Sequence, residues 1–95
     1  MNKLWSDRAW DDYLYWQMQD KKILKRINQI IKDTECNGLS EGIGKPEPLK
    51  HRKVWSRRID DVNRLVYNLD SNGSLWIIAC KGYYEDQHKN YDIRI

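Results

Sequence analysis

Residues 54–81 read VWSRRIDDVNRLVYNLDSNGSLWIIACK, with three strand-like runs separated by two polar turns. The runs cover residues 54–60, 64–70 and 75–81, and the second turn contains Asn72-Gly73. β-Branched and aromatic residues favour strands, and an Asn-Gly pair is typical of a tight hairpin. The region is therefore predicted to form an antiparallel meander of three strands.

The alternation of side chains predicts how the first two strands of this meander pair. Strand pairing places Arg58 near Arg64 on the polar face, where their like charges repel each other. The same register places Arg57 on the apolar face, which requires its stem to pack and its guanidinium to reach solvent. The predicted core face comprises Trp55, Ile59, Leu65, Tyr67 and Leu69.

The beginning of the chain predicts a short strand and a helix. Residues 3–5 are the strand candidate, and Ser6 can cap the helix because its hydroxyl accepts a backbone hydrogen bond. Asp7 then lies in the first turn, where the helix dipole favours an acidic side chain. The residues predicted to share one face of this helix are Trp10, Tyr13, Leu14 and Gln17.

A second helix is predicted to begin after Asp20, which suits a cap position, and to end near Thr34. It carries isoleucines at i, i+4, i+7 and i+8, a spacing typical of a buried stripe. These residues are Ile23, Ile27, Ile30 and Ile31.

Residues 35–48 contain three glycines and two prolines and have no periodicity. This composition predicts an irregular connection, and long loops in small domains are often functional. Together the elements predict an α+β fold in which two N-terminal helices pack on a small antiparallel sheet.

The composition is that of one small domain, with 95 residues of which 40% are hydrophobic. Its longest apolar run, residues 75–80, is much shorter than the roughly 20 residues that cross a bilayer. Residues 1–6 lack an apolar signal segment, so we expect a cytoplasmic protein with no membrane partner. Cys36 and Cys80 belong to no zinc-binding motif and are expected to be reduced thiols.

Basic residues are concentrated in two segments. Residues 21–32 contain five Lys or Arg and no acid, and residues 45–58 contain six with Glu47 as the single acid. Such clusters favour a polyanion such as RNA, or an acidic protein segment. For residues 21–32 the alternative is a solvated helix face.

Four short strings in this order resemble the YoeB/Txe toxins of the RelE superfamily. They are WDDYLYW at residues 10–16, GKPEPLKH at 44–51, WSRRI at 55–59 and RLVY at 64–67. The resemblance covers residues 1–84, so residues 85–95 are expected to be a C-terminal extension of the same domain. It implies a RelE/YoeB-like two-layer domain and the toxin of a type II toxin-antitoxin module.

The resemblance also implies an activity and partners. Members of this family are endoribonucleases that dock in the ribosomal A site, cut mRNA there and so inhibit translation. A cognate YefM-like antitoxin holds them silent, and a homodimer is expected within the complex. The chemistry needs no metal or other cofactor, because the RNA 2′-hydroxyl can attack the adjacent phosphorus when a base, an acid and cations assist.

Site residues are carried over from the matching strings. The resemblance makes Glu47 the general base and Arg64 the contact to the scissile phosphate, with Arg58 and Lys50 as supporting cations. The structural alternative for Glu47 is an acid that balances the charge of neighbouring lysines. For Arg64, Arg58 and Lys50 the alternative is a surface salt bridge. The further RNA-binding candidates are Lys45, Arg52, Lys53 and Arg57.

The chain departs from the family at the end of the domain, where a His-Tyr pair is replaced by Tyr83-Tyr84. Tyr84 matches the family tyrosine and can stack on a base or orient the phosphate. Tyr83 can donate a proton, since a phenol is protonated at neutral pH. Alternatively, His51 or His88 is the general acid in place of Tyr83.

A third alternative is that no acid remains, in which case the protein is a weakened toxin homologue that acts mainly as an antitoxin- and RNA-binding module. An RNA-binding domain without any nuclease activity is a further alternative. An acid such as Glu47 argues against it, because a carboxylate weakens plain RNA affinity.

Overall fold

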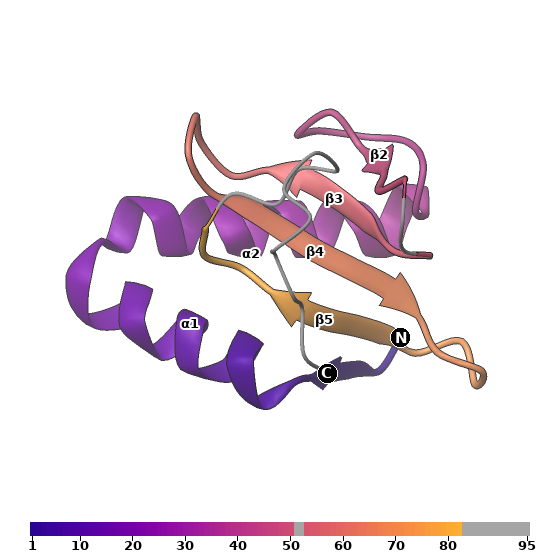
Figure 1. Ribbon diagram of the computed structural model, residues 1–95, viewed down its shortest axis with the longest axis horizontal. Helices are drawn as coiled ribbons and strands as arrows, with labels where there is room; N and C mark the ends of the chain where they lie inside the picture. Colours follow the sequence, from indigo (N-terminus) through magenta and orange to yellow (C-terminus); the bar gives the residue numbers. More distant parts are fainter. Residues whose placement is uncertain (51–52, 83–95) are drawn as a thin grey trace.

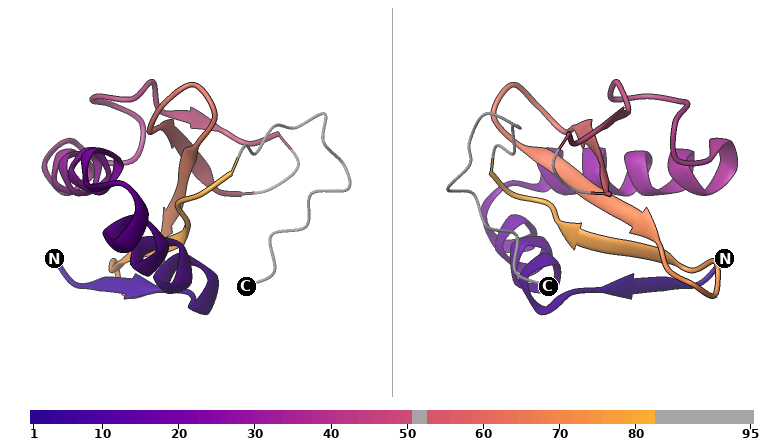
Figure 2. Two further views of the ribbon diagram at one scale, coloured as in Figure 1. Left: turned by 90° about the vertical axis from the view of Figure 1, so that its left-hand side faces the viewer. Right: turned by 45° about the vertical axis from the view of Figure 1, so that its right-hand side comes forward.

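The computed structural model describes residues 1–50 and 53–82 and has the predicted α+β fold. Both helices lie on one side of the sheet, so the domain has two layers (Figures 1 and 2). The elements, in chain order, are β1 (Lys3–Trp5), α1 (Asp7–Gln19), α2 (Lys21–Asn37), β2 (Glu47–Pro48), β3 (Trp55–Arg58), β4 (Arg64–Leu69) and β5 (Leu75–Ala79).

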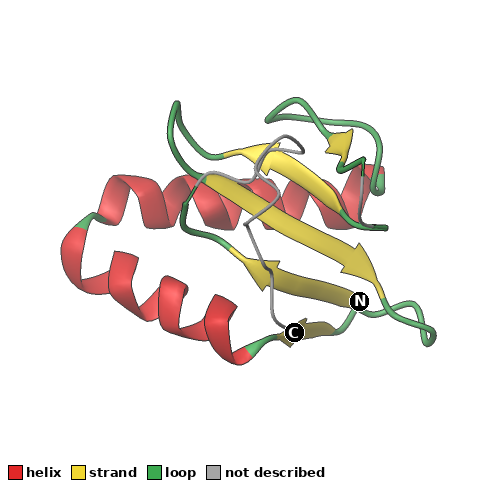
Figure 3. Ribbon diagram, viewed as in Figure 1, coloured by secondary structure: helices red, strands yellow, loops and turns green. Residues whose placement is uncertain are grey.

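Within the described residues, the sheet has five strands in the order β1-β5-β4-β3-β2 (Figure 3). The predicted meander is confirmed, since β3 pairs antiparallel to β4 and β4 pairs antiparallel to β5. The sheet is mixed rather than antiparallel throughout, because β1 pairs parallel to β5 with Lys3 opposite Leu75. A strand of three residues contains no local signal for a partner this distant in sequence, so the mixed sheet could not be derived from it.

The register predicted between β3 and β4 is also confirmed, with Arg58 opposite Arg64 and Trp55 opposite Tyr67. Leu65 and Tyr67 belong to the main core with the helix side chains. Leu69 is an exception to the predicted core face, because it lies at the end of β4 and is 40% exposed.

Helix α2 presents the predicted isoleucine stripe to the sheet. Ile27, Ile30 and Ile31 are buried, and Ile23 packs against them. Asp20 caps the helix by accepting hydrogen bonds from the amides of the second and third residues after it. The helix continues one turn beyond the predicted end, because Gly38, with a φ of 88°, is the residue that caps it.

Helix α1 is capped by Ser6 as predicted, but its buried face is rotated by one residue from the predicted one. Trp10 is 47% exposed and Leu14 is 40% exposed, whereas Asp12 and Trp16 are buried with Ala9. This face is turned inward because two of its polar groups bind the backbone of Cys80. Asp12 accepts a hydrogen bond from the Cys80 amide at 3.0 Å, and Trp16 Nε1 donates one to the Cys80 carbonyl at 2.9 Å. An apolar periodicity cannot reveal such a pair.

Cys36 is exposed and Cys80 is buried, and both are free thiols. Burial raises the pKa of the Cys80 thiol, so this group stays protonated at neutral pH. In the two described ranges no helix combines the length and the apolar character that a membrane span requires.

The contact between Trp16 and Cys80 joins α1 to the end of β5 and predicts a stability effect. Trp16→Phe keeps an aromatic ring but leaves the buried Cys80 carbonyl without its donor. We expect the free energy of unfolding to fall by about 1–3 kcal/mol, measured by urea denaturation. Trp10→Phe, at an exposed position of the same helix, is the control and is expected to change it by less than about 0.5 kcal/mol. Equal losses in the two variants would contradict the role of the hydrogen bond.

Candidate functional site

Glu47 lies on β2, an exposed strand of two residues at the edge of the sheet. It pairs with Ser56 of β3, and backbone hydrogen bonds hold the chain on both sides of this pair. Before it, the Arg58 amide donates to the Gly44 carbonyl at 2.6 Å. After it, the Leu49 amide donates to the Val54 carbonyl at 3.0 Å. The expectation of an irregular connection up to residue 48 is corrected here, since the segment ends in a strand that carries the predicted base.

The register places Glu47, Arg58 and Arg64 on one face of the sheet. Residues directly opposite each other in an antiparallel pair point to the same face, as do residues two apart in a strand. Glu47 is opposite Ser56, and Arg58 is opposite Arg64. Leu65, which follows Arg64 in β4, points to the opposite face and packs in the core with the helices. The face that carries Glu47, Arg58 and Arg64 is therefore turned away from both helices.

The turn before β4 holds Arg64 at the start of its strand. Asp60 Oδ1 accepts hydrogen bonds from the amides of Val62 and Asn63 at 2.8 and 2.6 Å. Burial raises the pKa of Asp60, but the hydrogen bonds from Asn63 and Val62 outweigh it and the net shift is downward. Arg64 is 6% exposed, and its Nη1 donates to the Asp60 carbonyl at 3.2 Å. The guanidinium of Arg64 is therefore held beside the turn.

Gly82, the last described residue, is anchored beside Arg64. The Arg64 amide donates to the Gly82 carbonyl at 2.9 Å, and the Gly82 amide donates to Asn63 Oδ1 at 2.8 Å. The chain thus reaches the start of β4 just before Tyr83.

The remaining predicted cations lie close to Glu47 in sequence. Lys45 and Lys50 are exposed on either side of it, and Lys53 is exposed before β3. Several predicted residues lie outside the described part of the chain: His51, Arg52, Tyr83, Tyr84 and His88, together with the extension at 85–95.

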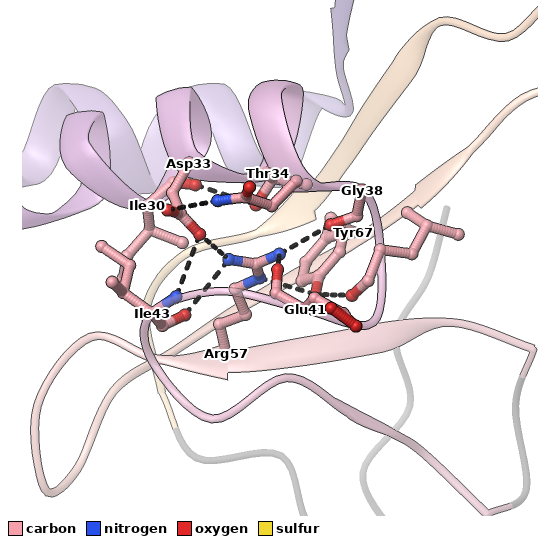
Figure 4. Close-up of polar contacts among 10 residues, drawn as sticks. Ile30, Asp33, Thr34, Gly38, Glu41, Ile43, Arg57 and Tyr67 are labelled. Carbon is pink, nitrogen blue, oxygen red and sulfur yellow. Dashed lines mark hydrogen bonds and ion pairs between the residues drawn. The ribbon is translucent and has the colours of Figure 1, made fainter.

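Arg57 differs from the exposed lysines at 45, 50 and 53, because its side chain is completely buried. The prediction that it contacts RNA is wrong for this structure, and so is the expectation that its guanidinium reaches solvent. The guanidinium instead points toward α2 and the loop after it (Figure 4). Its contacts are the carboxylate of Asp33 at 2.6 Å, the hydroxyl of Tyr67 at 2.9 Å, and the carbonyls of Gly38 at 2.7 Å, Glu41 at 2.7 Å and Ile43 at 3.2 Å.

These contacts, called the Arg57 cluster below, satisfy a buried charge. A guanidinium has five N–H donors, and burying it is costly unless the donors and the charge are compensated. Asp33 supplies the opposite charge. Tyr67 accepts from Arg57 Nε, donates to the Leu39 carbonyl at 2.7 Å, and places its ring 5.5 Å from the guanidinium carbon. The cluster therefore joins α2, the following loop, β3 and β4.

Asp33, a member of the Arg57 cluster, and Gly42, which lies against Asp33, are not predicted site residues. Asp33 also accepts a hydrogen bond from the Ile43 amide at 2.9 Å. Gly42 has a φ of 121°, and a Cβ there would lie 1.8 Å from Asp33 Oδ2. The acid near the helix end and the nearby glycines are the signals in the sequence, but an arginine that is expected to contact RNA predicts no buried acidic partner.

Comparison with known proteins identifies the relatives of this chain. Residues 5–84 match the family model described as "YoeB-like toxin of bacterial type II toxin-antitoxin system". Toxin YoeB of Escherichia coli O6:H1 is 55% identical over 86 residues, which are 88% of this chain and 100% of that protein. Toxin YoeB of Synechocystis sp. is 45% identical over 87 residues, or 90% of this chain and 99% of that one.

Solved structures agree with these matches. The YoeB dimer from Staphylococcus aureus has 43% identity and a TM-score of 0.82, covering 88% of this chain and 98% of that chain. A heterotetrameric YoeB-YefM complex from the same organism has 45% identity and a TM-score of 0.80, with the same coverage. The YoeB/ParE toxin from Agrobacterium tumefaciens has 38% identity and a TM-score of 0.83, covering 88% and 100%.

The Arg57 cluster predicts how stability depends on pH. The hydrogen bond from Arg57, followed by that from the Ile43 amide, lowers the pKa of Asp33 below its ordinary value. A depressed pKa contributes stability that is present above the ordinary value and is lost as the pH falls through the folded-state value. Wild type is therefore expected to lose more stability between about pH 4.5 and pH 2 than Asp33→Asn, measured by urea denaturation across this range.

Glu35→Gln provides the control for this measurement. Glu35 lies on the same helix and forms an ion pair with Lys3 at 2.9 Å, outside the Arg57 cluster. The free energy of unfolding of this variant is expected to change with pH as that of wild type does. An Asp33→Asn curve parallel to wild type throughout this range would contradict the assignment.

Proposed function

The chain belongs to the YoeB-like toxins of bacterial type II toxin-antitoxin systems, and on this basis we propose that it is a ribosome-dependent endoribonuclease that inhibits translation. Its substrate is mRNA in the ribosomal A site, which places its action in the cytoplasm. The observation that supports this most strongly is the register that puts the carboxylate of Glu47 on the same sheet face as Arg58 and Arg64. A base and cations on one surface are two of the three groups that assist metal-independent cleavage of RNA, the third being an acid.

In the proposed reaction, Glu47 removes the proton from the 2′-hydroxyl of the nucleotide before the cut. The 2′-oxygen then bonds to the adjacent phosphorus, while the bond from phosphorus to the 5′-oxygen of the next nucleotide breaks. The products are a 2′,3′-cyclic phosphate and a 5′-hydroxyl, so no water is consumed. Arg64 and Arg58 stabilise the negative charge that develops on the phosphorane oxygens, and Lys50 assists them.

The leaving 5′-oxygen needs a proton, and we assign its donor to Tyr83. Gly82, the residue before it, is hydrogen-bonded to Arg64 and Asn63, which anchors the chain at the predicted site. A phenol has an ordinary pKa of about 10 and is therefore protonated at neutral pH. Tyr84 then has the role of stacking on a base or orienting the phosphate, and Lys45, Lys53 and Arg52 bind the RNA backbone.

We propose a YefM-like antitoxin as the protein partner. The related toxin from Staphylococcus aureus is found in a heterotetrameric YoeB-YefM complex and also as a dimer. The exposed lysines at 45, 50 and 53 offer a basic surface to an acidic antitoxin segment. In this assignment residues 1–84 form the toxin domain, with 85–95 as an extension of it.

The role of Glu47 predicts a large loss of activity without loss of the fold. Glu47→Gln keeps the shape of an exposed side chain but removes the base, so the cleavage rate is expected to fall about 10²–10⁴-fold. The rate is measured as mRNA cleavage by the purified protein on ribosomes with a defined A-site codon. Circular dichroism checks that the fold is retained.

Glu41→Gln is the matched control, because Glu41 is another exposed carboxylate of the same connection. Its side chain is expected to be dispensable, since the hydrogen bond from Arg57 goes to the backbone carbonyl of Glu41. A Glu47→Gln variant as active as Glu41→Gln would exclude Glu47 as the base.

The role of Tyr83 predicts opposite effects of two substitutions. Tyr83→Phe removes the hydroxyl and is expected to lower the cleavage rate at least about tenfold, whereas Tyr83→His is expected to preserve or raise it. Single-turnover cleavage on ribosomes measures both variants. Equal rates in wild type and both variants would exclude Tyr83 as the acid. If wild type itself binds antitoxin but cuts no mRNA, the weakened-homologue alternative is favoured instead.

A further inference from the structure

The strand that carries Glu47 is short and lies at an edge. β2 has two residues, both exposed, and it pairs on one side with β3. Two-residue pairing contributes little stability by itself, because few backbone bonds offset the entropy of ordering the chain. The position of Glu47 therefore depends on how the flanking segments are held, of which the preceding connection is the longer.

That connection is held from inside the protein by Arg57. Between Gly38 and Gly44 the described chain has no helix or strand, yet three of its carbonyls accept hydrogen bonds from one guanidinium. Asp33 holds Ile43 from the other side by accepting its amide hydrogen. The peptide groups on both sides of Ile43 are thus bound to the Arg57–Asp33 ion pair.

A short, stiff segment links this anchor to Glu47. Gly44 lies against β3, where a Cβ would be 3.0 Å from the Arg58 carbonyl and 3.1 Å from Arg57 Cβ. Lys45 follows with a φ of 52°, in the left-handed region. Pro46 comes next, and its ring restricts φ to about −65°. Little conformational freedom remains between the anchor and the base.

We propose that Arg57, paired with Asp33, is a positioning residue for the base Glu47. The buried guanidinium fixes the loop after α2, and through Gly44 it sets where β2 presents the carboxylate on the sheet face that carries Arg58 and Arg64. This inference rests on the proposed function of Glu47. Arg57 itself touches no reacting group, since it lies on the helix side of the sheet and Glu47 lies on the other.

The test separates positioning from general stability. Single-turnover cleavage of ribosome-bound mRNA is measured with protein in excess, which gives a maximal rate and a half-saturating concentration. Arg57→Lys keeps the charge but cannot reach three carbonyls, a carboxylate and a hydroxyl at once. The maximal rate is expected to fall about 10–100-fold, because a displacement of about 1 Å is enough for such a loss. The half-saturating concentration is expected to change less than about twofold, since the RNA-facing cations are untouched.

The deciding measurement repeats the substitution in the Glu47→Gln background. If Arg57 acts through Glu47, Arg57→Lys is expected to change the residual rate less than about twofold there. A loss by the same factor in both backgrounds would show a merely structural role and overturn the proposal. So would a raised half-saturating concentration with an unchanged maximal rate.

Asp33→Asn keeps the test decisive if Arg57→Lys does not fold, because Asp33 is partly exposed and the change is isosteric. It is expected to lower the maximal rate about 3–10-fold, again only with Glu47 present. Glu35→Gln, which breaks an ion pair outside the cluster, is the matched control and is expected to behave as wild type. An active wild type with an unaffected Asp33→Asn would overturn the positioning role alone. A wild type that cuts no mRNA would overturn the proposed function as well.

Discussion

The burial of one guanidinium constrains a large part of this domain. A charge removed from water destabilises the fold unless every donor is bound, and Arg57 is buried with contacts to a carboxylate, a phenol and three carbonyls. These partners come from α2, from β4 and from a loop without regular structure. Helix, sheet and loop must therefore each be in place before the charge is compensated, which gives the irregular segment a defined path.

Much of the architecture could be predicted because it follows from local patterns. The caps at Ser6 and Asp20, the stripe on α2 and the register of β3 with β4 all depend on side chains near each other in sequence or directly across a hairpin. The face of α1 could not be predicted, since the buried Asp12 and Trp16 are satisfied by the backbone of Cys80. Contacts between polar groups distant in sequence leave no periodicity to read.

The candidate site divides in the same way. The register alone places Arg58 beside Arg64, and the roles proposed for Glu47 and the two arginines come from the resemblance of the short strings to the family. Arg57 could be predicted only in part. The alternation correctly placed it on the apolar face, but its charge is compensated by a buried ion pair with Asp33 and does not reach water. Nothing in a strand pattern identifies a partner on a helix, and only the tertiary structure does.

The pairing of β1 with β5 orders events during synthesis. Among the described strands, β1 is the first to leave the ribosome and β5 the last, yet the two are parallel neighbours. Their contacts are of high sequence separation and form only after the intervening helices and strands have been made. A nascent chain therefore lacks the partner of its first strand until translation has passed residue 79. The topology therefore makes completion of the sheet a late event of synthesis, and a chain that stops before β5 leaves its first strand without a partner.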